Sequence, residues 1–318
     1  MKAFIVFLLL LFITLAQAQA QTVITSPAPF QIFQRSTSTT GAIWISGETA
    51  PNVEITGVWG VFTLPALYSD VYGHFEALWP DLMVWQHDLV LTIDGVEYTV
   101  ENVGIGDVYV VAGQSNAMGL GRHYQQYIST LGFRAGMLTT DGWGELADPT
   151  GYVTDQHAKG SQWPLLATYI LEYGVPVAFI PTARGSTSIT QWQPGTNPNN
   201  RVVNLLNSLP APYARAVLWQ QGEADVNMTK RIYANNLETM TDAWHSAFNI
   251  PLFAALLYNN TRVNAGINIA ISERPYILHG ANLSQLPRDS GAHYTTDANL
   301  NAEAVAWWQA LVIAGFYP

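Results

Sequence analysis

The sequence predicts a chain in two parts: a small all-β sandwich domain, followed by a three-layer α/β/α domain with a five-stranded parallel sheet. Three observations predict this fold. The 318 residues exceed one average domain, and 49% hydrophobic residues are enough for a large core. Short strand-like runs fill the first part of the chain. Apolar runs separated by amphipathic stretches fill the rest, as expected for α/β architecture.

Residues 1–20 have the pattern of a signal peptide. Lys2 is followed by an apolar run and then by small residues up to Ala20 that suit a cleavage site. The apolar run is shorter than the roughly 20 residues that span a bilayer. The chain also has no cysteine for lipid attachment. We therefore expect a secreted or periplasmic protein without a membrane anchor after cleavage.

The all-β domain is predicted over residues 21–104. Short apolar or alternating runs lie between turn residues there, most clearly at 41–47, 53–58 and 88–93. Asp94 and Gly95 separate two such runs, and an Asp-Gly pair supplies the positive φ angles of a tight hairpin turn. Several short strands at this spacing favour a β-sandwich.

The α/β domain is predicted over residues 105–318. Strands that are apolar throughout and alternate with helices indicate a parallel sheet covered on both faces. The expected strands are residues 108–112, 175–181, 214–219, 251–257 and 276–278. Amphipathic stretches at 165–173 and 230–248 and a final helix at 298–314 are the expected covering helices.

Composition excludes several kinds of chemistry. A net charge of −10 and only three lysines argue against a nucleic-acid partner, which requires a basic surface. The absence of cysteine excludes disulfides, thiolate nucleophiles and cysteine-ligated metals. No metalloprotease, phosphate-loop or dinucleotide motif is present, so we expect neither a metal nor an organic cofactor. Oxygen and imidazole groups must then carry any reaction.

The first candidate for such chemistry is Ser115. The segment G-Q-S-N at 113–116 directly follows the first strand of the α/β domain. In an open α/β sheet, ligands bind outside the carboxyl ends of the strands. A serine on the turn there would expose its hydroxyl to a ligand. The alternative is that Ser115 merely caps the following helix, which is the commonest role of serine in this position.

Two segments, G-D-V-Y at 106–109 and G-Q-S-N-A-M at 113–118, resemble the first block of the SGNH hydrolase superfamily. More narrowly, they resemble the sialate O-acetylesterase-like carbohydrate esterases, although Ala117 is inserted before the methionine. The resemblance implies that Ser115 is the nucleophile and that its N–H contributes to an oxyanion hole. Gln114 and Asn116 take supporting positions beside it.

Two later segments are similar to further blocks of this family. The loop after the second strand contains Gly185, which the resemblance makes the second oxyanion donor. The segment W-Q-Q-G-E-A-D at 219–225 follows the third strand and makes Gln221 the third donor. A carboxamide suits that role because it donates hydrogen bonds without titrating. Glu223 and Asp225 are expected to support the site through hydrogen bonds.

The resemblance also selects the general base among seven histidines. His293 lies in a turn-rich loop before the final helix, as does the family's D-x-x-H motif. Asp289 is the expected orienting acid of a Ser-His-Asp triad. The spacing here is D-x-x-x-H, one residue longer than in the family, so Asp297 and Glu223 are reserve candidates.

The function implied is an exported serine esterase that removes O-acetyl groups from a sugar, either sialic acid or an acetylated polysaccharide. Trp192, with Trp143 and Trp163, is expected in the substrate cleft, and Arg184 could bind a sugar carboxylate. A general short-chain acyl esterase is the first alternative. A non-catalytic glycan-binding protein on the same scaffold is the second.

Overall fold

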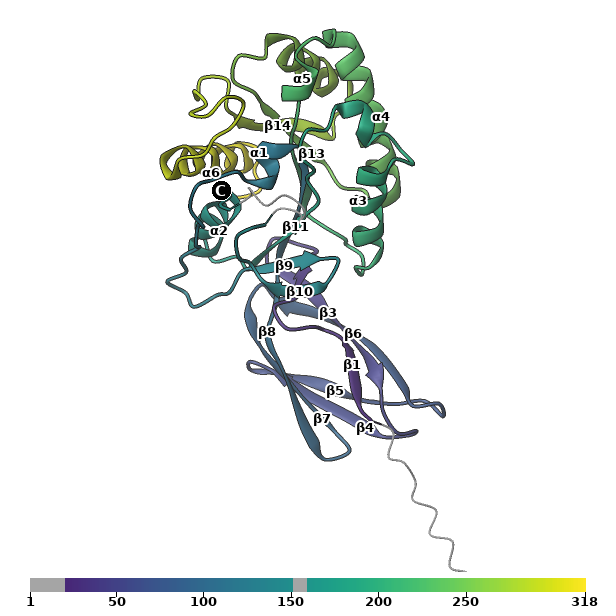
Figure 1. The fold of residues 1–318 in the computed structure, drawn as a ribbon. Helices are drawn as coiled ribbons and strands as arrows, with labels where there is room; N and C mark the ends of the chain where they lie inside the picture. The colour runs from purple at the N-terminus through teal and green to yellow at the C-terminus, as the bar shows by residue number, and fades with distance from the viewer. Residues whose placement is uncertain (1–20, 151–158) are drawn as a thin grey trace, which may run out of the picture.

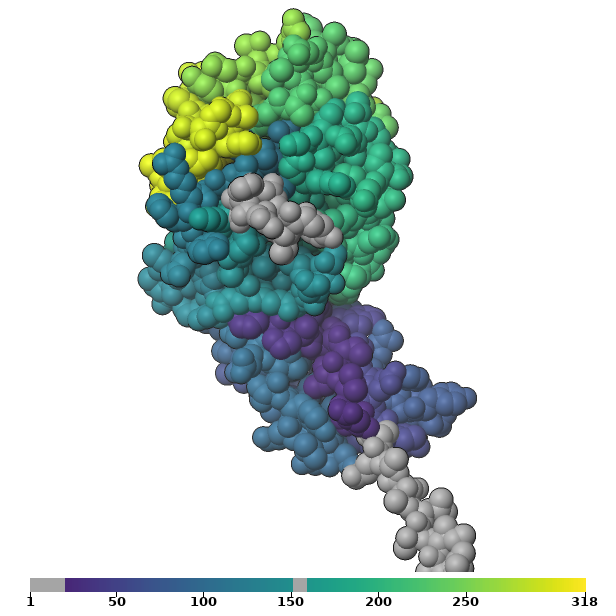
Figure 2. All heavy atoms as spheres, viewed as in Figure 1, coloured from purple at the N-terminus to yellow at the C-terminus, as the bar shows by residue number. Residues whose placement is uncertain are grey.

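The computed structural model describes residues 21–150 and 159–318, so the predicted signal peptide lies outside the described residues. The chain forms an elongated β part and a larger α/β part (Figure 1). The space-filling view shows the N-terminal strands, in purple and blue, in continuous contact with the α/β part (Figure 2). Within the described ranges, no helix is both long and apolar enough to cross a membrane.

The β part contains two sheets around one apolar core. The three-stranded antiparallel sheet consists of β1 (Val23–Ser26), β3 (Thr40–Glu48) and β6 (His74–Met83). The opposing strands are β4 (Glu54–Trp59), β5 (Phe62–Tyr68), β7 (Gln86–Ile93) and the first half of β8 (Val96–Gly113). Alternate residues of both sheets face inward, among them Ile43, Ile45, Ile55, Trp59, Leu89 and Leu91.

The turn between β7 and β8 is the predicted Asp-Gly hairpin. Ile93 pairs with Val96, and Asp94 and Gly95 have φ angles of 51° and 75°. Gly95 has no Cβ, so this left-handed conformation costs it little. The local sequence signal was therefore sufficient to place this turn.

Strand β8 connects the two parts of the molecule without a linker. It pairs with β7 in the β part and with β11 (Val177–Pro181) and β12 (Ala216–Gln220) in the α/β part. The short strand β2 (Ile32–Gln34) runs parallel to it. Residue 105, where the sequence predicts the domain boundary, lies inside this strand.

A buried ion pair reinforces this junction. Arg35 Nε and Nη2 each donate to an Asp107 carboxylate oxygen at 2.8 Å. Tyr317, next to the C-terminus, donates to the same carboxylate at 2.6 Å. The β part, the central strand and the chain end are thus connected through one carboxylate.

The α/β part contains a sheet with six parallel strands, whereas the sequence predicted five. The sheet order is β10–β9–β11–β8–β12–β13–β14, and all of these strands except β10 run parallel. The remaining bounds are β9 (Gly136–Thr139), β10 (Gly142–Glu145), β13 (Leu252–Leu256) and β14 (Ile277–Asn282). The five predicted strands correspond to β8, β11, β12, β13 and β14. The sixth, β9, was missed because its four residues form no apolar run.

Helices cover both faces of this sheet (Figure 1). One face packs against α3 (Asn197–Asn207), α4 (Lys230–Phe248) and α5 (Thr261–Glu273). The other packs against α2 (Trp163–Glu172) and α6 (Asp297–Ile313). Strand β8 contributes Val108 and Val110 to the first core and Tyr109 and Val111 to the second. This burial on both faces explains why the strand is apolar throughout.

Candidate active site

The candidate site lies at the carboxyl edge of the central strands. In the parallel register, Val111 of β8 lies opposite Pro181 of β11, and Gly113 lies opposite Gln220 of β12. The loops that follow these three strands therefore leave the sheet at one edge. Ser115 is the first residue of the short helix α1 (Ser115–Met118), directly after β8.

Ser115 and His293 form a direct hydrogen bond. Ser115 Oγ lies 3.0 Å from His293 Nε2, although 178 positions separate the two residues in the sequence. His293 is half-buried in the loop between β14 and α6, where its backbone exchanges two hydrogen bonds with Ser290. This distance is the one expected between a nucleophile and its general base.

Asn116 holds the histidine loop from both sides of His293. Its Nδ2 donates to the carbonyl of Ala292 at 3.0 Å, and its Oδ1 accepts from the N–H of Tyr294 at 3.3 Å. Asn116 Nδ2 also donates to Glu223. Burial raises the pKa of the Glu223 carboxyl. Asn116 therefore fixes His293 relative to Ser115 through the backbone.

The Asp289 carboxylate is occupied by the start of α6. It accepts from both the N–H and the hydroxyl of Thr295 and Thr296, and from Asn299 Nδ2 at 2.7 Å. Burial alone would raise the pKa of Asp289, but these hydrogen bonds outweigh it and lower the pKa. In the part of the chain that the structure describes, no hydrogen bond joins Asp289 to His293.

The two reserve acids also have other partners. Asp297 lies 3.2 Å from His123 Nδ1 and accepts from Gln125 at 3.0 Å. Glu223 accepts from Asn116. Among residues 21–150 and 159–318, neither carboxylate has a hydrogen bond to His293.

The Gln221 carboxamide faces inward, contrary to the expected role of third oxyanion donor. The residue has no exposed surface. Its Nε2 donates to Thr187 O at 2.9 Å, Asp225 Oδ2 at 2.6 Å and Gln114 Oε1 at 3.1 Å. Its Oε1 accepts from the Tyr233 hydroxyl at 3.0 Å. Both of its side-chain N–H groups are used internally, so neither is left for a substrate.

Asp225 connects two loops of the candidate site. It lies in the 3-10 turn η2 (Glu223–Asp225) after β12 and is buried. It accepts from Ser188 Oγ at 2.6 Å and from the N–H of Ile189 at 2.8 Å. These bonds fasten the loop that follows β11 to the loop that follows β12.

Gly185 and Arg184 lie on the loop after β11, next to the strand that carries Ser115. The Arg184 N–H donates to the carbonyl of Gly113 at 2.9 Å. In residues 21–150 and 159–318, the N–H of Gly185 has no hydrogen-bond acceptor. The side chain of Arg184 is exposed. This loop therefore offers a free backbone donor and an accessible cation.

Trp192 is a core residue and not a substrate contact, which corrects the expectation from the sequence. It ends the 3-10 turn η1 (Ile189–Trp192), has no exposed surface, and packs edge-to-face on Trp219 with ring centroids 5.1 Å apart. Trp163 is equally buried. Trp143 lies half-buried in β10 and packs against the core. Loop position favoured a cleft, but the rings of Trp163 and Trp192 are buried.

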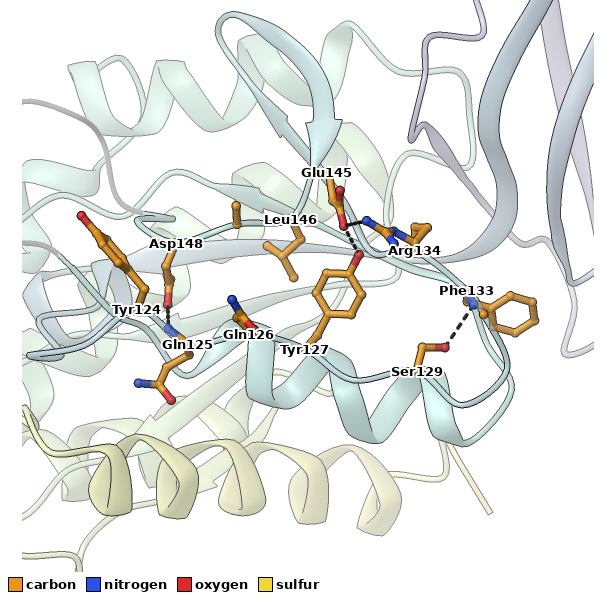
Figure 3. A pocket seen from close by; sticks show the side chains of 12 residues that line it. Tyr124, Gln125, Gln126, Tyr127, Ser129, Phe133, Arg134, Glu145, Leu146 and Asp148 are labelled. Carbon is orange, nitrogen blue, oxygen red and sulfur yellow. Dashed lines mark hydrogen bonds and ion pairs between the residues drawn. The ribbon is translucent and has the colours of Figure 1, made fainter.

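A polar hollow of about 610 Å³ lies near the histidine loop and was not anticipated from the sequence (Figure 3). The segment leading into it is bonded to the histidine loop, since Arg122 N–H donates to Thr295 O at 2.9 Å. Figure 3 shows the Tyr127 hydroxyl pointing toward Glu145, which also binds Arg134. No motif marks these residues, because only the fold brings them together.

A serine bonded to a histidine at the carboxyl edge of a parallel sheet is the arrangement that serine-dependent hydrolases use. A family model described as carbohydrate esterase, sialic acid-specific acetylesterase, matches residues 105–302, more than half of the chain. The chain belongs to this family and is a carboxylic ester hydrolase. A comparison with curated protein sequences gives no match.

Solved structures support the fold. A novel carbohydrate acetylesterase from Xanthomonas citri, XAC1771, superposes with a TM-score of 0.63 at 17% identity. The superposition covers 92% of this chain and 76% of that one. A protein from Arabidopsis thaliana superposes with a TM-score of 0.53 at 16% identity, covering 66% of this chain and 98% of that one. At these identities the likeness is one of fold.

Proposed function

We propose that this protein is an exported serine esterase that removes O-acetyl groups from carbohydrates through an acyl-enzyme. The observation that carries the proposal is the 3.0 Å contact between Ser115 Oγ and His293 Nε2. It lies within the part of the chain that matches the acetylesterase family. The serine is 7% exposed, so a small acyl group suits it better than a bulky one.

The reaction has two half-reactions. Ser115 Oγ attacks the acetyl carbonyl while His293 Nε2 accepts the hydroxyl proton. The tetrahedral intermediate collapses, the C–O bond to the sugar breaks, and His293 gives the proton to the departing sugar oxygen. A water molecule, activated by the same imidazole, then attacks the acetyl-serine ester. Acetate leaves, and Ser115 regains its proton.

Two backbone N–H groups are proposed to stabilise the oxyanion, those of Ser115 and Gly185. The Gly185 N–H lacks an acceptor in the described chain, and its loop is fastened to the Ser115 strand through the Arg184–Gly113 hydrogen bond. Removal of one oxyanion donor typically slows a reaction about 10²–10³-fold. The enzyme therefore depends on the position of this loop, which Asp225 fixes.

Asp289 is proposed as a positioning residue for the histidine loop. Five groups at the start of α6 donate to its carboxylate, and Asn116 holds the same loop from the side of the nucleophile. These contacts hold the backbone on both sides of His293. The triad role predicted for Asp289 is the competing hypothesis, and it requires this carboxylate to turn toward His293.

The substrate is proposed to be an O-acetylated sugar that can carry a negative charge. With a net charge of −10, the chain has no broad attraction for acidic glycans, so a local cation is needed. Arg184 is exposed one residue before the proposed oxyanion glycine and can meet a sugar carboxylate. A short-chain esterase without sugar preference would make no use of this arginine.

We further propose that the protein is exported through cleavage within residues 1–20. We also propose that the mature chain has two domains, a β-sandwich domain (residues 21–104) and an SGNH-type domain (residues 105–318). Since β8 passes through residue 105 and Asp107 binds Arg35, we expect the two parts to unfold together. A single unfolding transition in calorimetry would support this coupling. Two separate transitions would contradict it.

The proposal is tested by acetate release from a panel of acetylated glycans and from a chromogenic acetate ester. Wild type is compared with Ser115→Ala and His293→Ala, with Ser246→Ala as a control, because Ser246 lies on α4 away from the site. We expect activity in wild type and in the control alone. Full activity in Ser115→Ala would overturn the assignment. Equal rates on all esters, sugar or not, would favour the short-chain esterase.

A further inference from the structure

The carboxamide of Gln114 has one end fully bonded and the other end free. Its Oε1 accepts from Gln221 Nε2 at 3.1 Å and from the N–H groups of Gly222 and Ala224, each at 3.2 Å. Backbone N–H groups can only donate, so the oxygen must be the atom that faces them. This determines which way the amide is turned. Its nitrogen points away from the loop after β12.

The Gln114 nitrogen lacks an acceptor but is not sealed inside the protein. The residue is 4% exposed, and within the described chain no hydrogen bond from its Nε2 is present. This nitrogen is not fully enclosed, and part of its surface remains accessible. Its two N–H groups are therefore available to an acceptor on a ligand.

Gln114 itself lies among the loops that form the candidate active site. Gln114 directly precedes Ser115, and its N–H donates to Gln220 O at the end of β12. Gln221 Nε2 bonds both to Gln114 Oε1 and to Thr187 O, so the Gln114 carboxamide lies beside the loop that carries Gly185. Gln114 is therefore the chain neighbour of Ser115, and its carboxamide oxygen shares Gln221 Nε2 with the loop that carries Gly185.

We propose that Gln114 Nε2, and not Gln221, is the side-chain donor to the oxyanion. The inference rests on the proposed function, whose tetrahedral intermediate supplies the acceptor. Gln221 then acts indirectly. Asp225 and Thr187 hold its amide, and this amide fixes the oxygen end of Gln114. A donor whose orientation is set before the substrate arrives needs no rearrangement in the transition state, which is what makes such groups effective.

The test uses Gln114→Met, which has a similar length and removes the free NH2 without adding a charge beside the oxyanion. We expect kcat on the chromogenic acetate ester to fall about 10²–10³-fold with KM changed little. The pH at which the acid limb of the kcat/KM profile bends should stay where it is in wild type, because the Ser115–His293 pair is untouched. A merely structural role would instead lower the fraction of folded enzyme.

Gln220→Met is the matched control. Gln220 is also a buried glutamine at this sheet edge, but both ends of its amide are bonded inside the protein, to Gln162 and Glu303. We expect it to lose thermal stability while folded enzyme keeps kcat within about tenfold, since no oxyanion donor is lost. If Gln114→Met does not fold, Gln114→Ala takes its place in the same comparison.

A second measurement reports on the tetrahedral anion without turnover. The boron atom of methylboronic acid forms a bond to Ser115 Oγ, and the hydroxyl proton of Ser115 passes to His293. The resulting tetrahedral boronate is an anion. The inhibition constant of methylboronic acid should rise at least tenfold in the Gln114 variant and stay near wild type in Gln220→Met. Wild-type kcat and wild-type boronate affinity in a folded Gln114 variant would overturn the inference. If Ser115→Ala is inactive in the same experiment, such a result would contradict only the role of Gln114 and would leave the esterase proposal in place.

Discussion

Substitution of Asp289 by asparagine distinguishes two ways of holding His293, the proposed general base. In the structure, Asp289 accepts from Thr295, Thr296 and Asn299 and makes no hydrogen bond to His293 within the described residues. Asparagine keeps one acceptor oxygen for the two threonine N–H groups but loses the charge. Hydrogen bonds to charged groups contribute about 1.5–3 kcal/mol, and exposure of Asp289 reduces this. We expect Asp289→Asn to cost about 1–2 kcal/mol of stability.

The kinetic consequence is the sharper part of this prediction. If Asp289 only anchors the loop, Asp289→Asn should lower kcat by less than about tenfold, because Asn116 still holds Ala292 and Tyr294. Loss of an acid that orients the imidazole costs about 10⁴-fold. The assay is steady-state hydrolysis of a chromogenic acetate ester near neutral pH, with folded enzyme quantified by circular dichroism. A loss near 10⁴-fold in fully folded protein would refute the anchor role.

Three further predictions concern other residues of the site and its surroundings. Asn116→Ala removes the contacts to Ala292 and Tyr294. We expect kcat to fall about tenfold or more, which corresponds to a barrier raised by about 1.5 kcal/mol, without a matching change in KM. Wild-type kinetics in this variant would contradict the prediction. Burial raises the pKa of Glu303 well above its usual value, so its ionisation opposes folding as pH rises. Relative to wild type, Glu303→Gln should therefore gain thermal stability between pH 5 and pH 8 (about the range where an unfolded Glu is ionised), and a constant difference would refute this. Arg184→Gln should raise KM for acetylated acidic sugars several-fold and leave neutral esters unchanged; equal effects on both would remove the arginine from substrate binding.

Much of the fold could be predicted because its signals are local. The central strands are apolar throughout since helices cover both faces, and the Asp94–Gly95 turn follows from φ angles that few residue pairs adopt. Strand β9 gave no such signal. It has four residues, and it joins the sheet through two paired positions on β11.

The pairing of Ser115 with His293 was predicted from motifs, while the orientations of the surrounding side chains were not. Gln114 and Gln221 are both amides at the same sheet edge, and only their hydrogen bonds reveal which nitrogen is free. Trp192 shows the same difficulty: a loop position in the sequence can still be a core position in space. For Asp289, five donors near the start of α6 bind the carboxylate, and no spacing rule anticipates that.

Covalent labelling of the nucleophile tests the central claim most directly. Wild-type enzyme is quenched in acid within the first turnover on a chromogenic acetate ester, digested, and mapped by mass spectrometry. The account predicts an acetyl group on the peptide that contains Ser115, and neither the acetyl group nor turnover in Ser115→Ala. An acetyl group on another residue, or turnover that persists in Ser115→Ala, would contradict it.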